Sequence, residues 1–194
     1  PDETISNPII SRILTTIVKA AIWFRIPINS IIRATVYKHF CGGITIKDSE
    51  RTMQKLWKSK IGTILDFSAE GKESEADFNR AMEETISSIY KAKEVTNIPF
   101  SVFKPTGLAR FSLLKKISSN KKLSEEEKKE KVAFEARIEN ICRISSENKT
   151  PVFMDAEESW IQTSIDIISL KMMRKFNKNN TYIFNTIQLY RKDR

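Results

Sequence analysis

The stretch Pro151-Val-Phe-Met-Asp-Ala-Glu-Glu-Ser-Trp160 decides how the rest of the chain is interpreted. Its continuous apolar run, residues 152–154, is typical of a short strand that is covered on both faces. Three carboxylates then follow within four positions, those of Asp155, Glu157 and Glu158. Because α/β folds place their ligand sites at the carboxyl ends of parallel strands, this stretch predicts a buried strand that ends at a functional rim.

Three other apolar runs have the same character, and predicted helices separate all four. These runs are Thr63–Ser68, Phe100–Phe103 and Tyr182–Gln188. Helical spacing of apolar residues predicts the intervening helices at residues 75–94, 124–147 and 159–176. The second of these helices opens with a capping box, in which Ser124 and Glu127 satisfy each other's backbone groups. Strands that alternate with helices predict a parallel sheet built of βα units.

Two architectures contain such units, the open doubly wound sheet and the (β/α)8 barrel. No GxGxxG or GxxxxGK[ST] motif follows any predicted strand, which weighs against a nucleotide-binding doubly wound sheet. Polar residues instead end every strand: Asp66, Ser68, Glu70, Lys104, Asp155 and Gln188. This pattern favours the barrel. A complete barrel has eight strands, so residues 61–194 are predicted to form about its first four βα units.

Residues 1–60 are predicted to form helices that pack on the barrel. Apolar spacing and breaker residues place these helices at residues 9–24, 28–40 and 45–60. The most apolar part, residues 9–32, is interrupted by Arg12, Lys19, Arg25 and Pro27. It therefore falls short of a transmembrane span, although a helix that lies on a membrane surface remains open.

The net charge of +9 raises the question of nucleic-acid binding. Lys and Arg are interspersed with Glu on predicted helices, as in residues 125–131, and such faces are explained by i,i+4 pairs. No nucleic-acid-binding motif is present, so a nucleic-acid partner is not expected. Cys41 and Cys142 lie far apart and His39 is the single histidine, so neither a metal site nor a disulfide framework is indicated.

The strand-end residues suggest a chemistry before any family is considered. Lys104 is followed by Pro105, which we expect to block immediate continuation into a helix. Its ammonium could bind an anionic group of a substrate, with Asp155 orienting it. Gln188 carries donors and an acceptor that suit the edge of a planar heterocycle. A structural Lys–Asp ion pair explains the same residues equally well.

Five motifs lie on these strand ends or in the turn before the first strand. They are His39-Phe40-Cys-Gly-Gly43, Ile64-Leu-Asp-Phe-Ser-Ala-Glu-Gly71, Phe103-Lys-Pro-Thr-Gly107, Asp155-Ala-Glu-Glu158 and Asn185-Thr-Ile-Gln-Leu-Tyr190. In this order the set resembles the proline dehydrogenase family, over nearly the whole chain. Each motif alone is weak, but five in register make a strong signal.

The resemblance implies a flavin-dependent enzyme with a distorted (β/α)8 barrel. Such enzymes oxidise L-proline to Δ1-pyrroline-5-carboxylate and pass electrons from FAD to a membrane quinone. It implies that Lys104 pairs with the substrate carboxylate beside the flavin, that Asp155 belongs to the same polar network, and that Gln188 hydrogen-bonds the flavin ring.

The remaining matched acids are expected to support this network. Asp66 and Glu70 fall on the family's first-strand acidic positions. Glu157 and Glu158 match the motif as well, but we expect them at the start of the following helix, where carboxylates favour the positive end of the dipole.

Two departures from the family pattern qualify the resemblance. Gly43-Ile44-Thr45 stands where the family often has Gly-Glu-Thr. The family's later motifs, Arg-…-Gly-Ala-Tyr and Tyr-…-Arg-Arg, are not among these 194 residues. We therefore expect that the C-terminal half of the barrel is needed, and that this chain alone binds no FAD and tends to aggregate or self-associate.

The resemblance implies a peripheral location, on the cytoplasmic face of the inner membrane in a bacterium or in the mitochondrion of a eukaryote. Two alternatives remain open at this stage. One is a barrel enzyme that uses Lys104 as a Schiff-base nucleophile. The other is a non-catalytic, degenerate half-barrel that binds a partner.

Overall fold

The computed structural model describes residues 8–24, 37, 41–43, 45–66 and 73–192. The chain divides into two compact units, Pro1–Thr52 and Met53–Arg194. The predicted helix at residues 28–40 lies outside the described residues, apart from Tyr37.

The first unit contains helix α2 (Pro8–Trp23) and the start of α5 (Ile46–Lys58). Both helices were predicted. Thr45 and Asp48 exchange two hydrogen bonds at the start of α5, because each backbone N–H donates to the other side chain, at 3.2 and 3.1 Å. Thr45 thus caps the N-terminus of α5.

The second unit is built on a parallel three-stranded sheet in the order β1 (Ser101–Phe103), β2 (Val152–Met154) and β3 (Ile183–Asn185). Ser101 pairs with Val152, which pairs in turn with Ile183. The first predicted strand is reduced to one parallel bridge, in which Leu65 pairs with Ser101. The predicted order and direction of the strands are therefore confirmed. β2 has the predicted bounds, while the other strands are shorter than expected.

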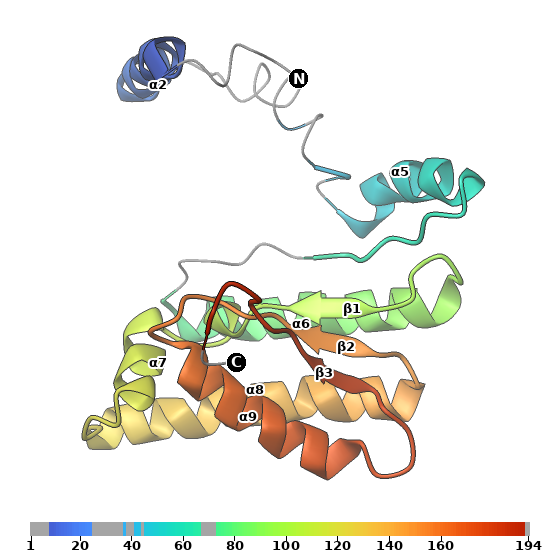
Figure 1. The fold of residues 1–194 in the computed structure, drawn as a ribbon, viewed down its shortest axis with the longest axis vertical. Coiled ribbons are helices and arrows are strands. Elements are labelled where there is room, and N and C mark those ends of the chain that lie inside the picture. The colour runs from blue at the N-terminus through green and yellow to red at the C-terminus, as the bar shows by residue number, and fades with distance from the viewer. Residues whose placement is uncertain (1–7, 25–36, 38–40, 44, 67–72, 193–194) are drawn as a thin grey trace. The chain divides into compact units, whose positions relative to one another are not determined.

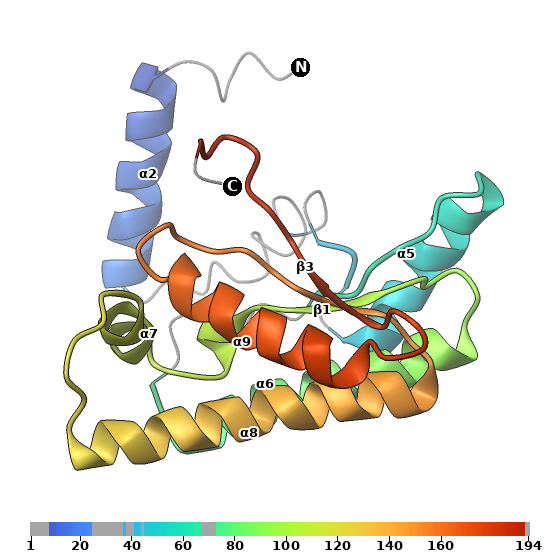
Figure 2. The same cartoon turned by 60° about the horizontal axis from the view of Figure 1, so that its bottom comes forward.

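Helices α6 (Glu75–Glu94), α8 (Glu125–Asn148) and α9 (Gln162–Phe176) pack on one face of this sheet (Figures 1 and 2). Ser74 caps α6 by accepting the N–H of Asp77. The predicted capping box of Ser124 and Glu127 is present at the start of α8. Two elements were not predicted, the 3-10 turn η2 (Pro105–Gly107) and helix α7 (Phe111–Ser118).

Alternate strand residues point into a core between the sheet and the helices. The strands contribute Phe103, Val152, Met154 and Ile183, all 3% exposed or less. The helices supply further buried side chains: Ile89, Phe134, Ile138, Ile141, Cys142, Ile165, Ile168 and Met172. This continuous cluster is the main stabilising feature of the unit, since burial of each such side chain contributes about 1.5–3 kcal/mol.

The opposite face of the sheet is aromatic and only half-buried. The rings of Phe100 and Phe153 stack with centroids 4.6 Å apart, and Phe184 meets both edge-on at 5.7 and 5.5 Å. The expectation that residues 152–154 are covered on both faces is thus only half met within the described residues. The structure confirms the α/β class, while the (β/α)8 barrel stays a prediction.

Among the described residues, no helix combines the length and the apolar character that crossing a membrane requires.

Candidate functional site

The carboxyl ends of the three strands bring together the segments that the sequence singled out. Lys104 follows β1, Asp155 follows β2 and Thr186 follows β3. Backbone hydrogen bonds hold these segments side by side. The N–H of Asp155 donates to the carbonyl of Phe103 at 3.0 Å, and that of Thr186 donates to the carbonyl of Met154 at 3.2 Å.

Lys104 is half-buried and stands directly before η2. Its carbonyl accepts the N–H of Gly107 at 2.9 Å, and that of Pro105 accepts the N–H of Leu108 at 3.0 Å. The expectation that Pro105 blocks a helix here is therefore wrong. Proline is tolerated in a first turn, where its missing N–H would have no helical partner.

Glu157 clamps this turn from the neighbouring strand end. Its carboxylate accepts the backbone N–H of Thr106 at 2.9 Å and also the hydroxyl of Thr106. Burial raises the pKa of the Glu157 carboxyl, and the repulsion of Glu158 acts in the same direction. The hydrogen bonds from Thr106 and the charge of Lys104 oppose this shift in pKa.

Glu157 and Glu158 do not start the following helix, so that prediction is wrong. Helix α9 begins at Gln162, and its first turn contains no acidic residue. The carboxylate of Glu157 instead lies at the start of η2, where it accepts the N–H of Thr106, one of the first-turn donors that have no partner within the helix. Gln162, which is 2% exposed, holds the Glu157 segment by accepting its N–H at 2.8 Å.

Asp155 is fixed by the segment that follows β3. Its Oδ1 atom accepts from the hydroxyl of Thr186 at 3.1 Å and from the N–H of Ala156 at 3.0 Å. Ala156 also donates to the Thr186 hydroxyl oxygen at 2.7 Å. The carboxylate is thus held at the strand ends, while its predicted partnership with Lys104 stays a prediction.

The side chain of Gln188, three residues after β3, contacts the segment that follows β2. Its Nε2 donates to the carbonyl of Glu157 at 2.8 Å. Its Oε1 is buried and meets no hydrogen-bond donor in the part of the chain that the structure describes. A buried acceptor without a donor is costly, which makes this atom a natural contact for a bound ligand.

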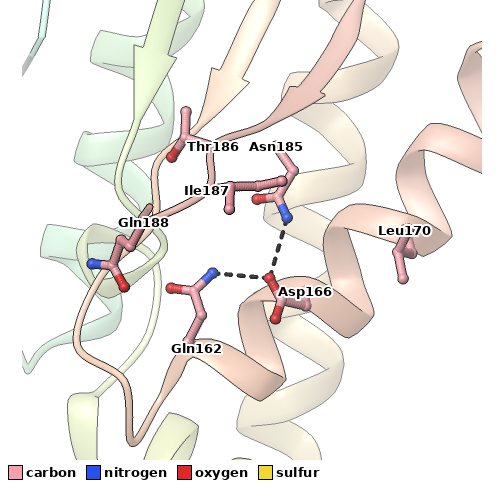
Figure 3. Close-up of a pocket in the computed structure, with 7 residues that line it drawn as sticks. All are labelled: Gln162, Asp166, Leu170, Asn185, Thr186, Ile187 and Gln188. Carbon is pink, nitrogen blue, oxygen red and sulfur yellow. Dashed lines mark hydrogen bonds between the residues drawn. The ribbon is translucent and has the colours of Figure 1, made fainter. Parts of the chain in front are cut away.

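A pocket of about 170 Å³ opens beside Gln188, between α9 and the residues after β3 (Figure 3). Its lining residues are Gln162, Asp166, Leu170, Asn185, Thr186, Ile187 and Gln188. The Oδ1 of Asp166 accepts from the amides of Gln162 and Asn185, at 2.9 and 3.2 Å (Figure 3). A chain of hydrogen bonds therefore connects this pocket through Gln162 to Glu157.

The sequence missed two members of this arrangement, Thr106 and Gln162. Thr106 stands within the Lys-Pro-Thr-Gly motif, which is a signal that could have marked it, whereas nothing in the sequence marks Gln162. Asp66 follows the Leu65 bridge, as expected, and Glu70 lies outside the described residues. Within those residues, no group of three or more His, Cys, Asp or Glu side chains could hold a metal ion.

The fold and the site define an α/β protein that gathers a lysine, carboxylates and a glutamine at the ends of parallel strands. A family model described as "Proline dehydrogenase" matches residues 49–194. The chain therefore belongs to the proline dehydrogenase family.

Curated proteins similar to the chain include a carbapenem biosynthesis protein and several proline dehydrogenases. The chain is 30% identical over 154 residues to the carbapenem antibiotics biosynthesis protein CarD of Pectobacterium carotovorum, covering 79% of this chain and 41% of CarD. It is 28% identical over 202 residues to the mitochondrial proline dehydrogenase 1 of Dictyostelium discoideum, covering 84% of this chain and 35% of that protein. The chain thus spans about two fifths of the length of these relatives.

A solved structure supports the fold. Proline utilization A of Bdellovibrio bacteriovorus, inactivated by N-propargylglycine, superposes with a TM-score of 0.63 at 18% identity. The match covers 80% of this chain and 17% of that one.

The family implies a flavin, and the residues present fit one. The edge of a flavin ring offers an N–H donor, which is what the buried Oε1 of Gln188 lacks among the described residues. The Nε2 of Gln188 is already engaged by Glu157, so the amide is oriented with its acceptor available.

Proposed function

We propose that this chain supplies substrate and cofactor contacts of an FAD-dependent enzyme that oxidises L-proline to Δ1-pyrroline-5-carboxylate. The observation that carries the proposal is the adjacency of Lys104, Asp155 and Gln188 at the ends of neighbouring parallel strands, in a chain that belongs to the proline dehydrogenase family. Because the chain spans only part of its relatives, the activity is proposed for the whole enzyme, including the C-terminal half of the barrel.

Lys104 would bind the carboxylate of proline. Lys104 is half-buried at the end of β1, where a partly desolvated charge would attract an anion more strongly than in water. The turn that follows is held by two hydrogen bonds from Thr106 to Glu157, so the backbone from which the lysine extends is held in place. A substrate bound through its carboxylate presents a defined carbon to the cofactor.

Asp155 and Gln188 would organise the rest of the site. Asp155, which is anchored by Thr186, would provide a negative charge for the substrate amine and for Lys104. Gln188 would accept a hydrogen bond from the flavin ring through Oε1, with Lys104 nearby. FAD, when bound, supplies the hydride acceptor, and the chain itself orients and desolvates the reactants.

The supporting residues, the electron acceptor and the location in this proposal are taken from the proline dehydrogenase family. Asp66, Glu70 and Glu158 would form the supporting network with Glu157. Electrons would pass to a membrane quinone, at the cytoplasmic face of the inner membrane in a bacterium or in a mitochondrion. The mitochondrial names of several relatives support the second location for eukaryotes.

The test is to fuse this chain to the C-terminal part of a proline dehydrogenase that carries the family's arginine motifs. We expect a yellow flavoprotein that reduces a dye only when proline is added. Lys104→Met should retain the flavin absorbance and raise the KM for proline by roughly ten- to a hundredfold, the cost of one charged hydrogen bond. Lys115→Met, at an exposed position of α7, is the matched control and should change neither.

Two results would contradict the proposal. Flavin binding without proline-dependent reduction indicates a non-catalytic half-barrel. Trapping of a carbonyl substrate on Lys104 by borohydride indicates a Schiff-base enzyme instead.

A further inference from the structure

Helix α2 presents a stripe of apolar side chains that its own unit leaves exposed. Ile13 and Ile17 are 54% and 58% exposed. Ala20 and Phe24 continue the stripe at helical spacing, since Ile13, Ile17, Ala20 and Phe24 lie four, three and four residues apart. The N–H of Phe24 donates to the carbonyl of Ala20 at 2.9 Å, so the helical turn extends to the end of the stripe.

An aromatic pair ends the helix. Trp23 and Phe24 are 77% and 67% exposed, and their rings meet edge-on with centroids 4.5 Å apart. Exposed tryptophan at the end of an apolar helix is typical of segments at a membrane–water interface, where the amphipathic ring sits at the headgroup level. This pair is therefore placed where an interfacial anchor would be.

The charges of α2 indicate which kind of lipid surface the helix would bind. Residues 8–23 include Arg12 and Lys19 and no acidic residue. These two cations are exposed and lie seven residues apart, which puts them on the same side of the helix, away from Ile13 and Ile17. Basic residues on the polar face of an interfacial helix attract anionic lipid headgroups.

The length of α2 excludes a span and permits a surface position. Its 16 residues rise about 24 Å, at about 1.5 Å per residue, which is less than the roughly 30 Å of a bilayer core. A helix that is too short to cross, apolar on one side and basic on the other meets the requirements for lying in the interface plane.

We propose that α2 binds the surface of an anionic lipid bilayer, with the Ile13–Ile17 stripe inserted below the headgroups and Arg12 and Lys19 in contact with lipid phosphates. The proposal rests on the peripheral location proposed above and gives it a named surface. Lipid binding by α2 needs no enzyme activity. The flotation experiment described next and the proline-dependent dye reduction described above can therefore fail independently of each other.

The experiment measures flotation of the whole chain with two kinds of vesicle, phosphatidylcholine alone and phosphatidylcholine mixed with phosphatidylglycerol. We expect strong partition to the mixed vesicles and weak partition to the neutral ones. Ile13→Asn/Ile17→Asn should weaken partition at least about tenfold, because the inserted apolar surface is lost. Thr15→Asn, off this stripe, is the matched control and should partition like the parent.

The charge arm uses Arg12→Gln/Lys19→Gln, which should weaken partition to the mixed vesicles by roughly thirtyfold and leave the neutral vesicles unaffected. Circular dichroism of every variant checks that the chain folds, and Trp23→Phe should remove a blue shift in fluorescence that the parent shows on binding.

Three outcomes overturn the proposal: no partition to the mixed vesicles, partition that the isoleucine variant retains, or self-association in size-exclusion chromatography that this variant abolishes.

Discussion

The two faces of the small sheet in the second unit are built from the same kind of residue and packed very differently. On the helix face, Val152, Met154 and Ile183 are fully buried against α8 and α9. On the other face, Phe153 and Phe184 are half-buried and pack mainly on each other and on Phe100. An apolar strand residue is thus not by itself a core residue, because its contribution depends on which layer covers it.

The largest expected difference is in the free energy of unfolding that large-to-small substitutions cost on the two faces. Ile138→Ala removes a fully buried side chain of α8 from the core that covers the helix face, and it should cost about 3–4 kcal/mol of unfolding free energy, from lost burial and the cavity that remains. Phe153→Ala, on the half-buried face, should cost about 1–2 kcal/mol although more atoms are removed. Urea unfolding measures both, and equal costs would show that the aromatic face is as well covered as the helix face.

The next largest effect concerns the buried arginine that secures the turn after η2. Arg137 lies on α8, its side chain is 7% exposed, and it donates to the carbonyl of Leu108 at 3.0 Å and to Asn79 at 2.8 Å. It also pairs with Glu75. Arg137→Met should cost about 2 kcal/mol because these acceptors lose their donor.

Arg143→Met provides the control for this substitution. Arg143 stands on the same helix but pairs with Glu147 at the surface, with both side chains about half exposed. Its loss should cost less than about 0.5 kcal/mol. Similar losses for the two arginines would refute the structural role of Arg137.

A smaller effect should appear as a pH dependence at Glu157. Burial raises the pKa of this carboxyl in the folded state, so the folded chain holds its proton to higher pH than the unfolded chain. The contribution of Glu157 to stability is therefore present below its ordinary pKa and lost as the pH rises through the raised folded value.

Glu157→Gln should remove this dependence. The stability difference between the parent and the variant, measured by urea unfolding across a pH series, should shift against the parent as the pH rises. Glu83→Gln, at an exposed position of α6, is the control and should leave the pH series of the parent unchanged, because Glu83 is not among the groups that shift the pKa of Glu157. An identical pH series for Glu157→Gln would show that the carboxyl is not desolvated.

The last prediction involves no change of stability. Cys142 belongs to the helix-face core, and burial raises the pKa of its thiol to about 12. Cys41 is exposed. A thiol reagent at mildly alkaline pH should therefore label one cysteine in the native chain and both in denaturant. Native labelling of a Cys41→Ser variant would indicate that the core opens.

Much of the fold follows from signals carried by neighbouring residues. The helix at residues 75–94 has the predicted bounds, because its apolar period and its polar start are written in consecutive positions. The capping box at Ser124 lies within four residues and was predicted for the same reason. Helix α7 was missed, since it is only eight residues long and begins without a side-chain cap.

In the candidate site, too, the features carried by neighbouring residues were predicted, and the feature that depends on a distant residue was not. Lys104, Asp155 and Gln188 were chosen because each stands at the end of an apolar run, and the structure places all three at the ends of the sheet strands or just beyond them. The role of Glu157 was misjudged, because its partner Thr106 lies 51 residues away in sequence. Only the pairing of β1 with β2 brings these two residues into contact.

The sequence by itself therefore determined the order of the elements, the parallel direction of the strands, the residues at the strand ends and the family. Each of these depends on local periodicity or on short motifs. The tertiary structure decided which face of the sheet is buried, how Glu157 clamps the Lys104 turn, and that Gln162 supports the same segment. These depend on contacts between residues far apart in sequence, which no local pattern encodes.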